Sequence, residues 1–191
     1  YLDLYARDRK RGGAWMDDCM GRKVRANGEL QTPVAYLVCN FNKAVGDKPA
    51  LFTHNEVTTL FHEFGHGIHH MLTQVDAAPV AGINGVAWDA VELPSQFLEN
   101  WCYEEEALSF ISGHYETDEP LPKELLDKLL AAKNFQSGMQ MLRQLEFSLF
   151  DFTIHHTYKA GEPCNIQATL DDVRSKTALV KAPAFNRFQH G

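Results

Sequence analysis

The chain has 191 residues, 45% of them hydrophobic, which is enough to bury a sizeable core in a globular domain. Its 18 basic and 25 acidic residues give a formal net charge of −7, which argues against nucleic acid or an anionic membrane surface as a partner. No run approaches the roughly 18 apolar residues that a membrane span needs, and no signal peptide opens the sequence.

Cysteine usage points to the same class of protein. The four cysteines, Cys19, Cys39, Cys102 and Cys164, are far apart and include no C-x-x-C pair, which argues against a thiolate metal site. We therefore expect reduced thiols and a cytoplasmic protein.

The first 41 residues predict a small antiparallel sheet. Residues 1–5 alternate large apolar and polar side chains, and residues 13–19 and 33–41 also have the composition of strands. Asn27-Gly28 predicts a turn between the last two strands. The strand 33–41 is nearly continuously apolar, as expected of a strand that is covered on both faces.

Residues 53–71 predict an amphipathic helix. Thr53 and Glu56 have the spacing of a capping box at its start. One stripe is apolar, and we expect it to face the core; it contains Val57, Leu60, Phe61, Phe64, Ile68, Met71 and Leu72. The ionisable side chains lie on the opposite side, namely His62, Glu63, His66, His69 and His70.

Within this helix the H-E-x-x-H pattern predicts a zinc site. His62 and His66 are one turn apart, so both imidazoles can face one ion, and Glu63 projects beside them. Gly65 and Gly67 flank His66, and glycine inside a helix suggests the close approach of another backbone or of a substrate. The alternative is a hydrogen-bonded or solvated surface pair of histidines. A catalytic zinc usually takes a third protein ligand and keeps one position for water.

The third ligand is expected on a second helix at residues 89–103, an assignment that Pro94 weakens unless it falls in the first turn. Four polar residues share one face of this helix: Glu92, Ser95, Gln96 and Glu99. Glu92 is the best candidate for the third ligand, and Glu99 is its main rival. Ser95, Gln96 or Glu99 could instead orient the ligands. Glu92 could also be only an acid that stabilises the helix N-terminus.

The rest of the chain predicts helices and carries little visible chemistry. They are expected at residues 104–112, 123–134 and 135–159, with a last helix that starts near Thr169 and ends before Pro183. The longest has apolar side chains at helical spacing that we expect in the core, including Met141, Leu142, Leu145, Leu149, Phe150 and Phe152. The expected fold class is mainly α-helical with a small antiparallel β-sheet.

Three segments resemble the thimet oligopeptidase family of zinc metallopeptidases: HEFGHGIHH at 62–70, VELPSQFLENW at 91–101 and YLDLYARDRKRGGAWMD at 1–17. The resemblance covers essentially the whole chain. It implies a zincin-like catalytic portion in which His62, His66 and Glu92 hold one zinc ion per chain and Glu63 is the catalytic carboxylate. It also implies a cytosolic, mainly helical enzyme that cuts short peptides and cannot admit folded proteins. In a peptidase, the strand 33–41 could pair with an extended substrate.

One feature of the family is missing. Its transition-state tyrosines and a histidine lie in a segment of the kind GGYxAxYY, which this sequence lacks, and His190 does not match that histidine. We therefore expect residues 1–191 to be the zinc-bearing part of a longer catalytic domain and to be poorly active or inactive alone. The alternatives to a metalloendopeptidase are a dipeptidyl carboxypeptidase of the same family and a zinc-binding fragment without catalytic activity.

Overall fold

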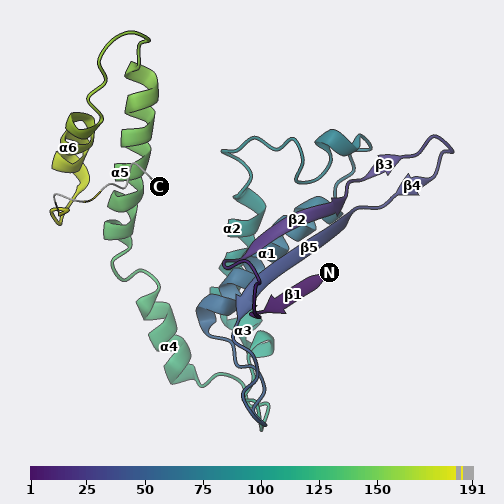
Figure 1. Ribbon diagram of the computed structural model, residues 1–191. Helices are drawn as coiled ribbons and strands as arrows, with labels where there is room; N and C mark the ends of the chain where they lie inside the picture. The colour runs from purple at the N-terminus through teal and green to yellow at the C-terminus, as the bar shows by residue number, and fades with distance from the viewer. Residues whose placement is uncertain (184–185, 187–191) are drawn as a thin grey trace. The chain divides into compact units, whose positions relative to one another are not determined.

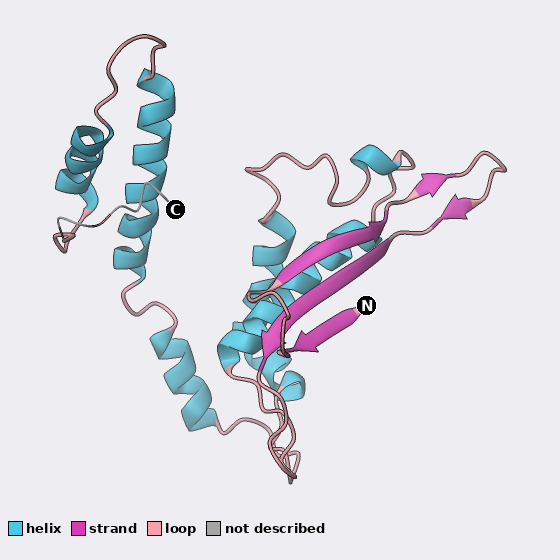
Figure 2. Ribbon diagram, in the orientation of Figure 1, coloured by secondary structure: helices cyan, strands magenta, loops and turns pink. Residues whose placement is uncertain are grey.

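The computed structural model describes residues 1–183 and 186, which belong to two compact units, Tyr1–Leu126 and Asp127–Gly191 (Figure 1). The strands are β1 Leu2–Tyr5, β2 Trp15–Met20, β3 Lys23–Val24, β4 Leu30–Gln31 and β5 Val34–Phe41. The helices are α1 His54–Met71, α2 Leu93–Glu99, α3 Glu105–Ile111, α4 Lys123–Ala132, α5 Ser137–Thr157 and α6 Ile166–Thr177, with the 3-10 turns η1 Ala78–Val80 and η2 Asn100–Tyr103. Helix predominates over strand, as expected (Figure 2).

The main sheet has the order β1-β5-β2 and is mixed, so the prediction of an antiparallel sheet is wrong for one of its two pairings. β2 pairs with β5 in the antiparallel sense, whereas β1 runs parallel to β5. Alternation of apolar and polar residues indicates which faces a strand presents, but it does not indicate its neighbour or its direction. The sequence had also suggested that this strand could pair with an extended substrate. Because β1 and β2 occupy the two edges of β5, that suggestion is wrong.

The predicted turn at Asn27-Gly28 is confirmed, and it connects a separate pair of strands, β3 and β4. Gly28 has a φ of +84°, a left-handed conformation that glycine adopts without steric cost. The Arg25 amide donates to the Glu29 carbonyl oxygen at 2.9 Å and closes the hairpin.

Helix α1 begins where the sequence predicts, and both hydrogen bonds of the Thr53 and Glu56 capping box are present. The prediction of its buried face is wrong. Phe64 is 42% exposed and Leu72 is 72% exposed, whereas the buried positions are Glu63, Gly65, His66, Gly67 and His70. Gly65 lets α2 approach α1 closely, and Gly67 lets Leu37 of β5 approach. The two glycines lie about 200° apart around the helix, so they border the buried side on which α1 packs (Figure 1).

The second unit is built on the packing of α5 against α6. Its buried cluster contains Phe150, Leu170 and Val173, with Ile154 packed against them. Of the six residues predicted for this core, Phe150 is buried and Leu142 is half-buried, while Met141, Leu145, Leu149 and Phe152 are exposed. A helix that packs against one partner can bury only one stripe of its surface. Helix α6 begins at Ile166, not near Thr169, because Asn165 accepts the hydrogen bond that caps it.

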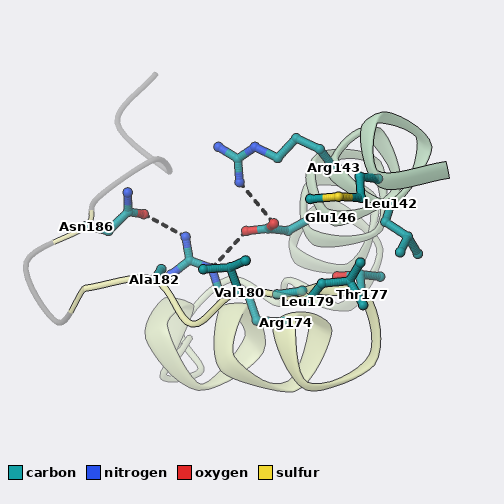
Figure 3. A pocket seen from close by; sticks show the side chains of 11 residues that line it. Leu142, Arg143, Glu146, Arg174, Thr177, Leu179, Val180, Ala182 and Asn186 are labelled. Carbon is teal, nitrogen blue, oxygen red and sulfur yellow. Dashed lines mark hydrogen bonds and ion pairs between the residues drawn. The ribbon is translucent and has the colours of Figure 1, made fainter. Parts of the chain in front are cut away.

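A pocket of about 300 Å³ lies between α5 and the segment that follows α6 (Figure 3). Glu146 is buried in its wall and accepts a hydrogen bond from Arg174 Nε at 2.8 Å. Arg143 forms an ion pair with the other carboxylate oxygen at 3.0 Å, and Arg174 also donates to Asn186. These interactions connect α5, α6 and the segment after α6, and the pocket contains none of the predicted zinc-site residues.

All four cysteines are free thiols, as expected from their spacing. Cys39 is buried in β5, and burial raises the pKa of its thiol to about 11. Across the described residues, no helix has the length and apolar character that crossing a membrane requires.

Candidate metal centre

Two histidines of α1 and the carboxylate that precedes α2 come together in the first unit. Nε2 of His62 and Nε2 of His66 are each 3.1 Å from Oε2 of Glu92. Within the part of the chain that the structure describes, these three residues are the group of His, Cys, Asp and Glu side chains with ligand atoms close enough for one metal ion, within 4.8 Å of one another. The structure therefore brings together the three residues that the sequence singled out as ligands.

The packing of α1 against α2 places Glu92 at this point. A Cβ atom on Gly65 would lie 2.5 Å from Cα of Ser95 and 2.6 Å from the carbonyl oxygen of Pro94, so only glycine allows this approach. Glu92 is the N-cap residue of α2, and Pro94 lies in the first turn, where its missing amide hydrogen costs little. The helix begins later than predicted, at Leu93, and continues into η2 as far as Tyr103.

Glu99 occupies the other side of the His62 ring. Its Oε1 is 2.6 Å from Nδ1 of His62, whereas Glu92 lies at Nε2. A carboxylate at Nδ1 accepts a hydrogen bond from the N–H of that nitrogen, which keeps the proton on Nδ1 and leaves the Nε2 lone pair free for a metal. This geometry suits Glu99 to orient His62, and it places Glu92 beside the nitrogen that is free to bind a metal. For His66, no described residue hydrogen-bonds the buried Nδ1 atom.

Burial shifts the pKa values of the two innermost groups. Glu63 is 6% exposed. Burial raises the pKa of its carboxyl group, and the Glu92 carboxylate adds to this effect while His62 opposes it. Burial also lowers the pKa of His66, against the attraction of Glu92. A neutral imidazole is the form that binds a metal, so both the position of His66 and the direction of its pKa shift suit a ligand.

The other two histidines of this helix face do not join the cluster. His70 is fully buried, with Nε2 at 3.0 Å from the carbonyl oxygen of Met20 and Nδ1 accepting from the Ile83 amide at 3.3 Å. His70 therefore connects α1 to β2 and to the loop before α2, a structural role that helical periodicity did not reveal. His69 has a buried Nδ1 without a partner among the described residues. His190 lies outside the described residues.

Ser95 and Gln96, the remaining residues of the polar face of α2, differ in their surroundings. Ser95 is fully buried and donates its hydroxyl hydrogen bond to Glu92, at 2.8 Å to Oε2 and 2.9 Å to the carbonyl oxygen. Gln96 is exposed. Of these two residues, only Ser95 contacts the cluster.

The donor set fits a zinc ion. In a tetrahedral zinc site with ligand bonds of about 2.0 to 2.1 Å, neighbouring ligand atoms are about 3.3 Å apart. The two nitrogen-to-oxygen distances of 3.1 Å are close to this separation. Two imidazoles and one carboxylate are also a common ligand set of catalytic zinc sites, which keep a fourth position for water.

Comparison with known proteins identifies relatives along the whole chain. Oligopeptidase A of Haemophilus influenzae is 69% identical over 190 residues, which cover 100% of this chain and 28% of the relative. Oligopeptidase A of Escherichia coli is 65% identical with the same coverage. Saccharolysin of Saccharomyces cerevisiae is 39% identical over 180 residues, which cover 94% of this chain and 25% of the relative. The chain thus spans about a quarter of the length of these relatives. The family model for peptidase family M3 matches residues 1–190, and the chain belongs to this family.

Proposed function

We propose that this chain carries the metal ligands and the catalytic base of a zinc-dependent metalloendopeptidase that hydrolyses short peptides. The observation that supports this most directly is the convergence of His62, His66 and Glu92 beside a buried Glu63. The names of the relatives, oligopeptidase A and saccharolysin, agree with a peptidase. Short peptides are accordingly the proposed substrates, and the cytoplasm is the proposed location.

His62, His66 and Glu92 are the proposed ligands of one zinc ion. When bound, zinc supplies Lewis acidity, which polarises a peptide carbonyl group and acidifies water. His62 presents Nε2 because Glu99 holds Nδ1 at 2.6 Å. Since burial favours the neutral imidazole of His66, little work is needed to remove a proton before the metal binds.

Glu63 is the proposed general base. It follows His62 directly in α1, so its carboxylate projects beside the ligands, about 100° around the helix. It accepts the proton of the attacking water and passes it to the amine of the leaving group. Its pKa is raised by burial, and a base works best when its pKa lies near the working pH.

The length of the relatives indicates that the 191-residue chain can bind zinc without being able to hydrolyse peptides efficiently. Because the chain spans 28% of Oligopeptidase A, we propose that it is the zinc-bearing part of a catalytic domain. Stabilisation of the oxyanion needs donors that are fixed at the substrate, and removal of one such donor typically costs about 10²- to 10³-fold in kcat. We therefore expect the 191-residue chain to bind zinc and to hydrolyse peptides poorly by itself.

The test separates metal binding from catalysis in the full-length enzyme. Glu63→Gln should retain zinc and lose about 10²- to 10⁴-fold in kcat, because an amide cannot accept the proton of water. His62→Ala should lose both zinc and activity. Glu105→Gln, at an exposed position of α3, is the matched control and should change neither. Zinc is measured by elemental analysis and hydrolysis with a short internally quenched peptide.

A Glu63→Gln enzyme that cleaves at the rate of the unmodified enzyme would remove Glu63 from the mechanism. If the full-length enzyme binds zinc but cleaves no peptide, the chain is a zinc-binding module without catalytic activity. Mass spectrometry of the products distinguishes the remaining alternative, since a dipeptidyl carboxypeptidase releases dipeptides from the C-terminus and an endopeptidase also cuts peptides whose C-terminus is blocked.

A further inference from the structure

The hydroxyl group of Ser95 contacts the oxygen atom of Glu92 that faces the two histidines. Ser95 Oγ lies 2.8 Å from Oε2 of Glu92. The same Oε2 atom is 3.1 Å from Nε2 of His62 and 3.1 Å from Nε2 of His66. One hydroxyl hydrogen bond therefore acts on the atom that is placed to bind the metal.

The position of Ser95 is fixed by the packing of the two helices. The residue is fully buried, and Gly65 of α1 leaves room for its backbone, because a Cβ atom at Gly65 would lie 2.5 Å from Cα of Ser95. A serine side chain has a single rotatable bond to its oxygen, so a fixed backbone leaves only a few positions for Oγ. The Glu92 side chain, in contrast, is 49% exposed and has several rotatable bonds.

The Ser95 hydroxyl has two acceptors but only one hydrogen, since Oγ is also 2.9 Å from the Glu92 carbonyl oxygen. A bond to the carbonyl three residues back is common at helix starts. Ser109 in α3 makes such a bond to the carbonyl oxygen of Glu106, at 2.6 Å. Hydrogen bonds to a charged carboxylate are roughly twice as strong as those between neutral groups, so the Ser95 hydroxyl favours Oε2.

We propose that Ser95 is a positioning residue that holds the Glu92 carboxylate with Oε2 directed at the two imidazoles. The inference rests on the proposed function, in which His62, His66 and Glu92 hold a metal ion. Fixing a long, half-exposed side chain costs conformational entropy. Because Ser95 restricts Glu92 before the metal arrives, less of this cost falls on metal binding, and the affinity for the metal rises.

The test compares Ser95→Ala with Ser109→Ala in the full-length enzyme that contains this chain. Zinc affinity is measured by competition with a chromogenic chelator, and the geometry of the site is followed by the visible absorption of the cobalt(II)-substituted protein. Ser95→Ala should weaken zinc binding by about 10- to 100-fold, the usual effect of losing a group that orients a ligand. Its cobalt spectrum should change as well. Ser109→Ala removes a similar hydroxyl bond at an exposed position of α3 and should change neither measurement.

A second pair of variants asks whether Ser95 acts through the carboxylate. In a Glu92→Gln background, adding Ser95→Ala should have little further effect on zinc affinity, because the two residues act as a unit. An equal loss in both backgrounds would show that Ser95 acts only through helix packing and would overturn the inference. Equal zinc affinity of Ser95→Ala and the unmodified enzyme would also overturn it while leaving the metal site intact. An unmodified enzyme that binds no zinc would refute the proposed function itself.

Discussion

A methyl group added at Gly65 would meet the backbone of α2, and we expect Gly65→Ala to separate Glu92 from the histidines. The new Cβ atom would lie 2.5 Å from Cα of Ser95 and 2.6 Å from the carbonyl oxygen of Pro94. Both are backbone atoms, so rotation of a side chain cannot relieve the contact. Helix α2 must move away from α1, and it carries Glu92 with it.

The size of this displacement decides whether zinc affinity or the free energy of unfolding changes more. Ordinary contacts of a Cβ atom begin at 3.4 Å, so α2 must shift by about 0.9 Å. Overpacking of this kind costs typically about 1 to 3 kcal/mol, while alanine gains about 1 kcal/mol over glycine in a helix. The free energy of unfolding should therefore fall by only about 0 to 2 kcal/mol. Zinc-to-ligand distances tolerate about 0.2 Å, so metal binding should suffer more than stability.

Gly67→Ala is the matched control, because it makes the same substitution two residues later in the same helix. There the new Cβ atom would lie 3.0 Å from Cδ1 of Leu37, the flexible end of a side chain. Zinc affinity is measured by chelator competition and stability by urea unfolding. Gly65→Ala should weaken zinc binding by at least about tenfold, and Gly67→Ala should largely preserve it. If Gly65→Ala binds zinc as tightly as the unmodified chain, the contact between α1 and α2 does not set the position of Glu92.

Three further changes test other parts of the structure. Glu92→Gln should weaken zinc binding more than Glu99→Gln does, because an amide is a poorer zinc ligand than a carboxylate and Glu99 contacts Nδ1 of His62, not the metal-facing nitrogen. If chelator competition gives the reverse order of zinc affinities, the roles of Glu92 and Glu99 are exchanged. Arg174→Ala should destabilise α5 and α6 by about 3 kcal/mol, because it removes a partner of the buried Glu146, and hydrogen exchange of these helices that stays unchanged would contradict this. Burial alone would raise the pKa of Glu146, but the hydrogen bonds from its arginine partners hold it below the ordinary value of 4.5. The unfolded chain therefore binds the proton more readily, so the stabilisation is fully present above pH 4.5 and is lost as the pH falls through the lower pKa of the folded state. The difference in hydrogen-exchange protection between the unmodified chain and Glu146→Gln should shrink in that acidic range, and a difference independent of pH would refute the assignment.

Local features of the chain were predictable from the sequence because neighbouring residues produce them. The capping box of Thr53 and Glu56 fixes the start of α1 through bonds between residues three apart. Pro94 lies in the first turn of α2, where its missing amide hydrogen costs little. The spacing of His62 and His66 on one helix face follows from helical geometry alone, and these residues do lie close together in the structure.

Contacts between distant segments decided the rest. The parallel pairing of β1 with β5 depends on which strand lies next to which, and the periodicity of a strand does not encode this. The apolar stripe of α1 predicted the wrong buried face, because Gly65 and Gly67 border the opposite side and allow α2 and β5 to approach there. The sequence also left open which carboxylate of α2 meets which imidazole nitrogen. Only the packing of α2 on α1 places Glu92 at Nε2 of His62 and Glu99 at Nδ1. Side chains that share a helix face reach different atoms of a neighbouring helix, and the distance and tilt between the two helices decide which atoms these are.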